Sequence, residues 1–276
     1  MCRNHQSIRL SKGFTLTELA VVIGLITVLT SLLLPAIAKV RSAANKAVCL
    51  SNLRQVGNAW SVYTAENRGH LMDYVWFTPK TPDVAWNGYW PGIMAHYDVR
   101  DRSLLCPSAS ESPFYSRMKV DDKFVNTKGY GTAKLAWSGK FGTNGTAIRL
   151  NAQTYRESSY GMNRYLTADG GFDPNTSQLS TTVPLVDVPV FMDAAYVDVR
   201  PLNGTPDAPV SSPPNLQGTA INPGTPEHWN FLIARHGRGV NVFMADGSAR
   251  WVILDDMYSL KWKANWTPTR LVLPNS

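Results

Sequence analysis

His236 and the acidic residues near it in the C-terminal half are the side chains best suited to catalysis. His236 stands ten positions before the pair Asp246-Gly247, and Asp193 precedes it in "VPVFMDA". In a catalytic triad, a histidine held by a carboxylate acts as the general base that activates a serine or cysteine nucleophile. No serine or cysteine lies in a nucleophile-elbow motif, the sharp strand-to-helix turn that exposes such a nucleophile. We therefore expect no enzymatic activity, a hydrogen bond from His236 to the backbone of an adjoining strand, and a turn formed by Asp246.

The same acidic residues are candidate calcium ligands. "MDAAYVD" offers Asp193 and Asp198, with Asp187 nearby. Calcium takes six to eight oxygen ligands, and known loops supply them at alternating positions. This spacing does not follow that pattern, so Asp193 and Asp198 are only weak calcium candidates. We expect no metal and no cofactor.

The three cysteines are Cys2, Cys49 and Cys106. They show neither a CxxC spacing nor a neighbouring histidine pair, which argues against a zinc site. Beyond the basic leader, which contains Cys2, two cysteines remain, Cys49 and Cys106, in the part of the chain that would face an oxidising compartment. A disulfide between them is therefore permitted, although the sequence does not demonstrate it.

Aromatic residues gather in "WNGYWPGIMAHY", at 86–97. Trp86, Tyr89, Trp90 and Tyr97 would suit stacking on sugars if they were exposed. Because aromatic side chains bury large areas, we favour a corner of the core.

Composition indicates a folded protein that does not bind nucleic acid. The chain has 276 residues, 44% of them hydrophobic and 11% aromatic, which is enough for a sizeable core. The first thirteen residues contain Arg3, Arg9 and Lys12 and no acid, and their removal lowers the formal net charge from +7 to +4. The remaining basic residues are scattered among acids, without the clustered basic face of a nucleic-acid site.

An uncharged segment near the N-terminus has the length of a membrane span. Leu19 to Ala38 are twenty uncharged residues, and at about 1.5 Å per residue they cover a bilayer core of about 30 Å. A signal peptide has a shorter apolar region, of roughly 7–15 residues, and "PAIAKV" only loosely imitates its cleavage site. The basic leader favours a cytoplasmic N-terminus, although Lys39 and Arg41 beyond the span weaken that argument.

The helix is expected to continue beyond this span, from about residue 15 to about 66. Apolar residues recur at steps of three and four as one stripe: Val40, Ala43, Ala47, Leu50, Leu53, Val56, Trp60 and Tyr63. Pro35 should loosen or kink the helix, Gly57 should weaken it, and Gly69 is a plausible C-terminal cap. The predicted membrane span is about 15–38 and the amphipathic half is about 39–66.

Residues 67–276 are expected to form one β-rich head. The candidate strands are 188–194, 230–235, 240–245 and 248–254, and the proline-rich stretch 202–230 reads as a long surface loop. Asp246-Gly247 separates two alternating runs, which predicts a β-hairpin whose two turn residues adopt positive φ angles. The predicted fold class is α+β: a long N-terminal helix packed on a head with an antiparallel sheet.

The stretch "KGFTLTE", with the span that follows it, resembles the prepilin motif of type IV pilins and type II secretion pseudopilins. The resemblance implies cleavage of leader 1–13 between Gly13 and Phe14 and N-methylation of Phe14. Glu18 stands at the family's glutamate, which neutralises the N-terminal ammonium of a neighbouring subunit in the filament, and Pro35 at its helix-loosening proline. Glu18 also has a simpler explanation, a place at the headgroup level favoured by the helix dipole.

The stretch from His236 to Asp246-Gly247 resembles the H-x9-DG signature of a pilin-like group whose biochemical role is poorly defined. "CLSNLRQVGNAWSVYTAENRGH", "LLCPS" and "YGMN" also resemble that group. Together these pieces touch most of the chain.

The resemblance implies a single-pass protein of the bacterial inner membrane, with its head in the periplasm or, within a filament, at the cell surface. The implied function is that of a pilin-like subunit of a type IV pilus or a type II pseudopilus. The implied partners are other pilin-like subunits, a prepilin peptidase, and the platform protein and ATPase of the assembly machine. The alternative is a membrane-anchored protein whose head binds an extracellular ligand such as a glycan.

Overall fold

The computed structural model describes residues 14–72, 90–99, 101–109, 137–138, 157–168, 170–173, 176–179, 183–195, 197–201 and 232–270. The chain divides into two compact units, Met1–Ala43 and Ala44–Ser276. The C-terminal part of the long helix therefore belongs to the same unit as the head. The predicted loop 202–230 lies outside the described residues.

The predicted long helix is present as α1, Leu16–Glu66, which has 51 residues and continues through Pro35. Pro35 has no N–H, so it cannot donate to the carbonyl of Ser31 four positions earlier. The helix ends where Gly69 adopts a φ of 81° and its N–H donates to the Thr64 carbonyl at 2.7 Å. Gly69 thus forms the predicted C-terminal cap.

The first unit contains the apolar part of α1. It includes an 18-residue window with a mean hydropathy of 2.5, and none of that window is buried within the protein. The hydroxyls of Thr27 and Thr30 donate to the carbonyls of Ile23 and Ile26, at 2.6 and 2.9 Å. These bonds satisfy the two hydroxyl groups within the helix, because lipid tails offer no hydrogen-bond partners. The segment is therefore long and apolar enough to serve as a membrane anchor.

The head contains a mixed sheet of five strands among the described residues, in the order β5-β3-β4-β6-β7. The strands are β3 (Tyr160–Asn163), β4 (Pro189–Asp193), β5 (Asp198–Val199), β6 (Gly239–Met244) and β7 (Ala249–Ile253). β5 pairs in parallel with β3, and the other neighbouring pairs are antiparallel. The predicted antiparallel sheet is therefore present as β3-β4-β6-β7, and the parallel strand β5 makes the whole sheet mixed. The chain reverses between β4 and β5 and adds β5 beyond β3, so β5 must run in the direction of β3.

The other elements of the described residues are short. They are α3 (Trp90–Ala95), η1 (Asp101–Leu104), β1 (Trp137–Ser138), β2 (Glu157–Ser158), η3 (Arg164–Leu166), η4 (Leu185–Asp187) and η6 (Leu254–Ser259). β1 and β2 form a separate antiparallel pair.

Three of the four predicted strands are confirmed as β4, β6 and β7. The described part of the fourth, 230–235, forms only isolated bridges, one of them between Leu232 and Ala194. The sequence-based prediction missed β3, because its four residues include Gly161 and Asn163, which are both depleted in strands.

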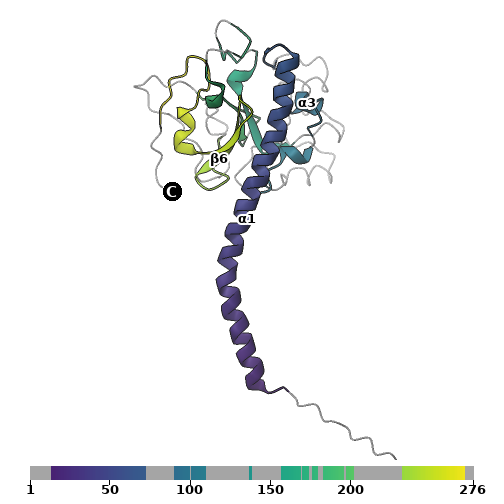
Figure 1. Cartoon of the computed structure of the whole chain (residues 1–276), viewed down its shortest axis with the longest axis vertical. Coiled ribbons are helices and arrows are strands. Elements are labelled where there is room, and N and C mark those ends of the chain that lie inside the picture. The colour runs from purple at the N-terminus through teal and green to yellow at the C-terminus, as the bar shows by residue number, and fades with distance from the viewer. Residues whose placement is uncertain are drawn as a thin grey trace, which may run out of the picture. The chain divides into compact units, whose positions relative to one another are not determined.

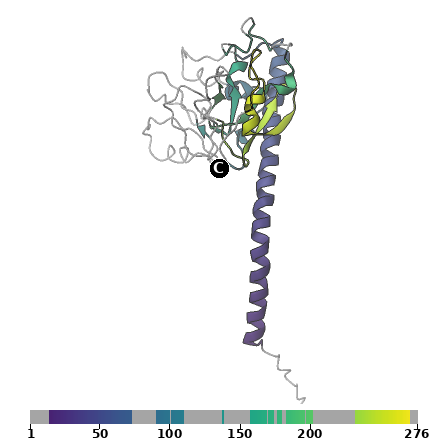
Figure 2. The same ribbon diagram turned by 90° about the vertical axis from the view of Figure 1, so that its left-hand side faces the viewer.

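The second half of α1 packs on this sheet, as Figures 1 and 2 show for the helix beside β6 and β7. Its buried positions are Cys49, Leu53, Val56, Gly57, Ala59 and Trp60. The predicted stripe was right from Leu50 onward and wrong before it, because Val40, Ala43 and Ala47 are exposed. Large buried aromatic side chains complete the core: Trp90, Tyr160, Phe172, Phe191, Phe243 and Trp262.

The hairpin of β6 and β7 has a different turn from the one predicted. Gly247 adopts a φ of 89°, and Asp246 is not among the described residues with positive φ. The Gly247 N–H donates to the Met244 carbonyl at 3.0 Å, and the Met244 N–H to the Ser248 carbonyl at 2.8 Å. One left-handed glycine after a tight turn is the arrangement of a three-residue hairpin loop. Asp246 still shapes the turn, since its Oδ1 accepts from the Ser248 N–H at 2.9 Å.

Candidate functional site

The start of α1 carries the residues of the predicted processing and assembly motif. Gly13 lies outside the described residues, and Phe14 is exposed. The Thr15 N–H donates to Glu18 Oε2 at 2.9 Å, the Thr15 hydroxyl donates to the same oxygen at 2.7 Å, and the Glu18 N–H donates back to Thr15 Oγ1 at 3.2 Å. This reciprocal pattern is a capping box. Within a single chain, Glu18 is therefore already bonded at the positive end of the helix dipole.

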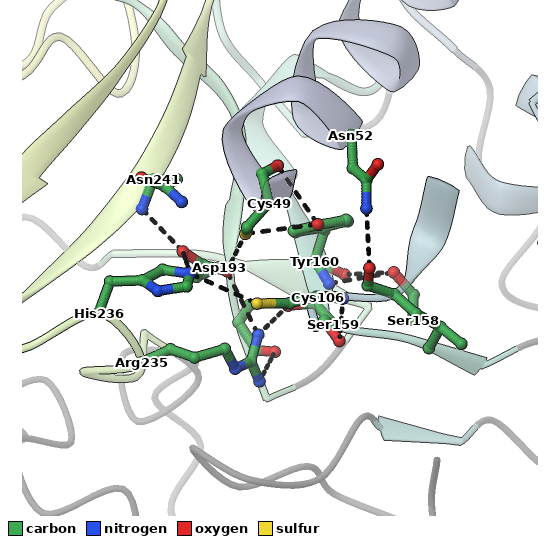
Figure 3. A network of polar contacts seen from close by, with 12 residues as sticks. Cys49, Asn52, Cys106, Ser158, Ser159, Tyr160, Asp193, Arg235, His236 and Asn241 are labelled. Carbon is green, nitrogen blue, oxygen red and sulfur yellow. Dashed lines mark hydrogen bonds and ion pairs between the residues drawn. The ribbon is translucent and has the colours of Figure 1, made fainter. Parts of the chain in front are cut away.

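A second group of polar residues is buried in the head, and Figure 3 shows how its side chains converge. It consists of Cys49 from α1, Cys106 from the segment after η1, Asp193 from the end of β4, and His236 from the loop before β6. We call these four residues the Cys-Cys-Asp-His cluster. All four are buried, and their candidate ligand atoms lie within 4.8 Å of one another.

Local hydrogen bonds hold the Cys106 segment in place. The Cys106 N–H donates to Ser159 Oγ at 3.0 Å, and the Asn52 side chain donates to the Leu105 carbonyl at 2.9 Å. The Ser158 hydroxyl donates to the Leu104 carbonyl at 3.0 Å. The segment is thus fixed both to α1 and to Ser158 and Ser159, which directly precede β3.

His236 is held mainly through its backbone. Its N–H donates to the Gly239 carbonyl at 3.3 Å, and its own carbonyl accepts from Trp251 Nε1 at 3.1 Å. Gly237 follows with a φ of 71°, which makes the reversal into β6 possible. These contacts leave the imidazole free to point into the cluster.

The contacts inside the cluster are short and share atoms. Cys49 Sγ lies 3.2 Å from Asp193 Oδ1, and Cys106 Sγ lies 3.4 Å from His236 Nε2. His236 Nε2 also lies 3.6 Å from Asp193 Oδ2. The expected hydrogen bond from His236 to strand backbone is made by its main-chain N–H, to Gly239 of β6, whereas the ring faces Asp193 and Cys106.

Asp193 is the charged centre of the cluster. Its side chain and that of Arg235 are both fully buried, and Arg235 Nη1 lies 3.4 Å from Asp193 Oδ1. The Asn241 N–H donates to Asp193 Oδ2 at 2.7 Å. A buried carboxylate is costly unless it is paired and hydrogen-bonded, and these partners supply both requirements.

The two thiols have opposite acid–base properties. A hydrogen bond from Cys49 lowers the pKa of Cys106 to about 5, against the effect of burial and with help from His236. Burial raises the pKa of Cys49, and the neighbouring Cys106 and Asp193 raise it further. The Cys106 sulfur is thus the one that carries negative charge more readily.

Burial also governs the neighbouring aromatic groups. It raises the pKa of the Tyr160 hydroxyl, which donates to Cys49 Sγ at 3.4 Å. For His236, burial disfavours the imidazolium, but the contacts with Cys106 and Asp193 outweigh it and raise the pKa. The environment therefore favours the charged forms of His236 and Cys106 and the neutral forms of Cys49 and Tyr160.

The geometry differs from that of a cysteine–histidine–aspartate relay. In a relay the base contacts the nucleophile through one ring nitrogen and the acid through the other. Here Cys106 and Asp193 approach the same nitrogen, His236 Nε2. A common approach to one point is instead the arrangement of ligands around a shared ion.

The weak calcium candidates do not share a site. Among the described residues, the groups able to hold a metal ion include Asp193 but not Asp198. Asp198 is buried on β5 and lies 3.6 Å from Arg164 Nε. Each carboxylate thus faces an arginine, and no group of three or more His, Cys, Asp or Glu ligands within the described part of the chain contains both.

The structure places the two cysteines side by side as buried, free thiols. Their sulfurs lie within 4.8 Å of each other, and no bond joins them, so the hypothetical disulfide is not formed in this structure. Local spacing argued against a zinc site, but the fold brings Cys49, Cys106 and His236 together from distant segments.

The aromatic stretch 86–97 is represented by its C-terminal part only, because Trp86 and Tyr89 lie outside the described residues. Trp90 is buried, its ring packs on Phe191 with centroids 4.9 Å apart, and its Nε1 donates to the Val197 carbonyl. Tyr97 donates to Glu66 at 2.8 Å. Trp90 is thus a core residue and is not available for stacking on a sugar.

Sequence reasoning missed Arg235, Tyr160 and Asn241 as parts of the cluster. Arg235 directly precedes His236, and this basic pair within an otherwise apolar stretch could have indicated that both side chains are buried beside an acid. Tyr160 and Asn241 lie on strands and carried no local signal.

Comparison with protein-family models, with curated proteins and with solved structures gives no significant match to this chain.

Proposed function

We propose that this chain is a pilin-like subunit that assembles through α1 into a type IV pilus or a type II secretion pseudopilus. Leader 1–13 is removed between Gly13 and Phe14, and Phe14 is N-methylated. The apolar half of α1 lies in the inner membrane and the head lies outside the cytoplasm. A prepilin peptidase, an assembly platform and its ATPase act on the subunit.

One observation carries the proposal. The 51-residue helix is apolar and exposed over its first half, and that half contains one acidic residue, Glu18 in its first turn. A charged group within a membrane segment costs about 2.5–3.5 kcal/mol on insertion scales and normally marks a functional contact. The freed ammonium of a neighbouring copy is a partner of the right charge.

In the single chain, the Glu18 carboxylate is already hydrogen-bonded within the capping box, so assembly has to give it an additional partner. Thr15 satisfies one oxygen of Glu18 inside the chain, through its N–H and its hydroxyl. After cleavage, the ammonium of Phe14 would lie at the positive end of its own helix dipole, which is unfavourable. Pairing that ammonium with Glu18 of another copy removes this repulsion, so the two ends have a reason to associate.

Intact-mass analysis of the membrane-extracted protein tests processing. We expect loss of residues 1–13 and one methyl group on Phe14 when the host contains a prepilin peptidase, and an intact leader in a host without it. Substitution of Gly13→Val should retain the leader in both hosts. A product that begins at Lys39 would instead indicate signal-peptide cleavage, and a chain that still begins at Met1 beside an active peptidase would contradict the proposal.

A further inference from the structure

The Cys-Cys-Asp-His cluster has the composition of a metal site. It offers two sulfurs, one imidazole nitrogen and one carboxylate, all within 4.8 Å of one another. Thiolate and imidazole ligands are those that zinc prefers, and structural zinc sites use four protein ligands in a tetrahedron. Figure 3 shows the four side chains converging from separate segments.

The distances agree with ligands that share one ion. The separations are 3.2 Å for Cys49 Sγ to Asp193 Oδ1, 3.4 Å for Cys106 Sγ to His236 Nε2, and 3.6 Å for His236 Nε2 to Asp193 Oδ2. Bonds of about 2.3 Å to sulfur and about 2.0–2.2 Å to nitrogen and oxygen place tetrahedral neighbours about 3.3–3.8 Å apart. These three separations are close to those that zinc requires, and Asp193 contributes a different oxygen to each of its two contacts.

Charge also balances around a divalent ion. Two thiolates and the Asp193 carboxylate carry three negative charges, and Zn²⁺ with the buried Arg235 guanidinium carries three positive ones. A neutral His236 completes the set. A buried site with no net charge avoids most of the desolvation cost of its individual ions.

Neighbouring groups hold the ligands in position. The Asn241 N–H donates to Asp193 Oδ2 at 2.7 Å, and the Tyr160 hydroxyl donates to Cys49 Sγ at 3.4 Å. Such contacts fix ligand orientation, and their removal commonly costs about 10–100-fold in metal affinity.

We propose that Cys49, Cys106, Asp193 and His236 form a structural zinc site that fastens the C-terminal half of α1 to the head. Binding releases to solvent whatever protons the two thiols and the coordinating imidazole nitrogen still carry, and it involves no change of oxidation state. The ligands come from α1, the segment after η1, β4 and the loop before β6, so one ion cross-links four distant parts of the chain. The site is closed by protein ligands, which is the pattern of a structural ion rather than a catalytic one.

A Cys49–Cys106 disulfide is the competing state of the same residues. It would consume both sulfurs and leave only His236 and Asp193 as ligands. Zinc binding and disulfide formation therefore exclude each other in one molecule, and a single measurement of metal and thiols separates them.

The test uses full-length protein extracted from membranes without chelator. Elemental analysis should find about one zinc per chain. Cys49 and Cys106 should resist alkylation until a zinc chelator is added, and should then both react. Two thiols that react freely without chelator, a Cys49–Cys106 disulfide in non-reducing peptide mapping, or a different bound metal would each overturn the proposal.

Substitutions assign the ligands. His236→Ala should lower zinc affinity by at least about tenfold, whereas His96→Ala, on an exposed histidine outside the cluster, should leave it unchanged. His236→Cys should retain zinc, because it replaces one preferred ligand with another. Equal zinc binding by wild type and His236→Ala would contradict the assignment.

A measurement on the unmodified chain covers the case in which a variant fails to fold. Replacement of zinc by cobalt(II) should give the charge-transfer and intense visible bands of a tetrahedral ion bound to thiolates. Weak bands typical of octahedral oxygen ligands would contradict the proposal. Because neither readout depends on leader cleavage or filament formation, the zinc site and the proposed function can fail separately.

Discussion

Gly57 of α1 lies directly against the ring of Phe243 on β6. A Cβ built on Gly57 would come within 2.3 Å of three atoms of that ring. The glycine that weakens the helix in terms of propensity is therefore the residue that lets the helix backbone approach the sheet.

We expect Gly57→Ala to destabilise the head. The added methyl forces Phe243 or the helix to move, and overpacking of this kind typically costs about 1–3 kcal/mol. The thermal midpoint of the full-length protein in detergent, followed by near-ultraviolet circular dichroism, should fall by about 2–4 °C for each kcal/mol. Gly24→Ala is the matched control, because nothing lies within 4 Å of a Cβ at that exposed position. An unchanged midpoint for Gly57→Ala would contradict this account of the packing.

The features predicted correctly from the sequence have local causes. The uncharged run from Leu19 to Ala38 and the apolar spacing from Leu50 onward define α1, and Gly69 defines its end. The hairpin of β6 and β7 follows from two alternating runs around a glycine. In each case the deciding residues lie within a few turns or one strand length of one another.

The features that were missed depend on contacts between distant residues. The Cys-Cys-Asp-His cluster joins positions whose numbers differ by as much as 187, and no local spacing rule links them. β3 and the parallel strand β5 are specified by their neighbours in the sheet, since β5 consists only of Asp198–Val199. The burial of Val56 but not Val40 likewise depends on where the head meets the helix.

Gly247 provides a test of the hairpin turn. Its φ of 89° is strained for any residue with a Cβ. We expect Gly247→Ala to lower the free energy of unfolding by about 1–3 kcal/mol, and Gly247→Asn to cost less, because asparagine tolerates the left-handed region. Denaturant titration of the two variants beside wild type gives the order. Equal stability of the alanine and glycine forms would show that the turn does not require this conformation.

Two arginines allow a comparison of a buried and an exposed ion pair. Arg235 pairs with Asp193 at 3.4 Å with both side chains fully buried, whereas Arg250 lies 3.8 Å from Asp187 with both side chains more than 40% exposed. Removing one partner of a buried pair leaves an uncompensated charge and costs about 3–5 kcal/mol. An exposed pair contributes about 0–1 kcal/mol.

We therefore expect Arg235→Met to destabilise the protein strongly and Arg250→Met to have little effect. Both variants should be measured by denaturant titration in the same buffer. Because methionine preserves much of the apolar stem of arginine, the difference reports mainly on charge. Similar losses for both variants would refute the central role of Arg235 in holding Asp193.

Glu18 offers the sharpest test of assembly, because its charge and its capping role can be separated. Glutamine at this position keeps the shape and can still bond to the backbone in a capping box. We expect Glu18→Gln and Glu18→Ala both to insert in the membrane and both to be absent from sheared filaments, since neither can neutralise the ammonium of a neighbouring copy. Thr15→Val removes the hydroxyl that donates to Glu18 at 2.7 Å but keeps the charge, so this variant should still assemble. Filaments from Glu18→Gln together with none from Thr15→Val would assign the role to capping and overturn the charge-pairing account.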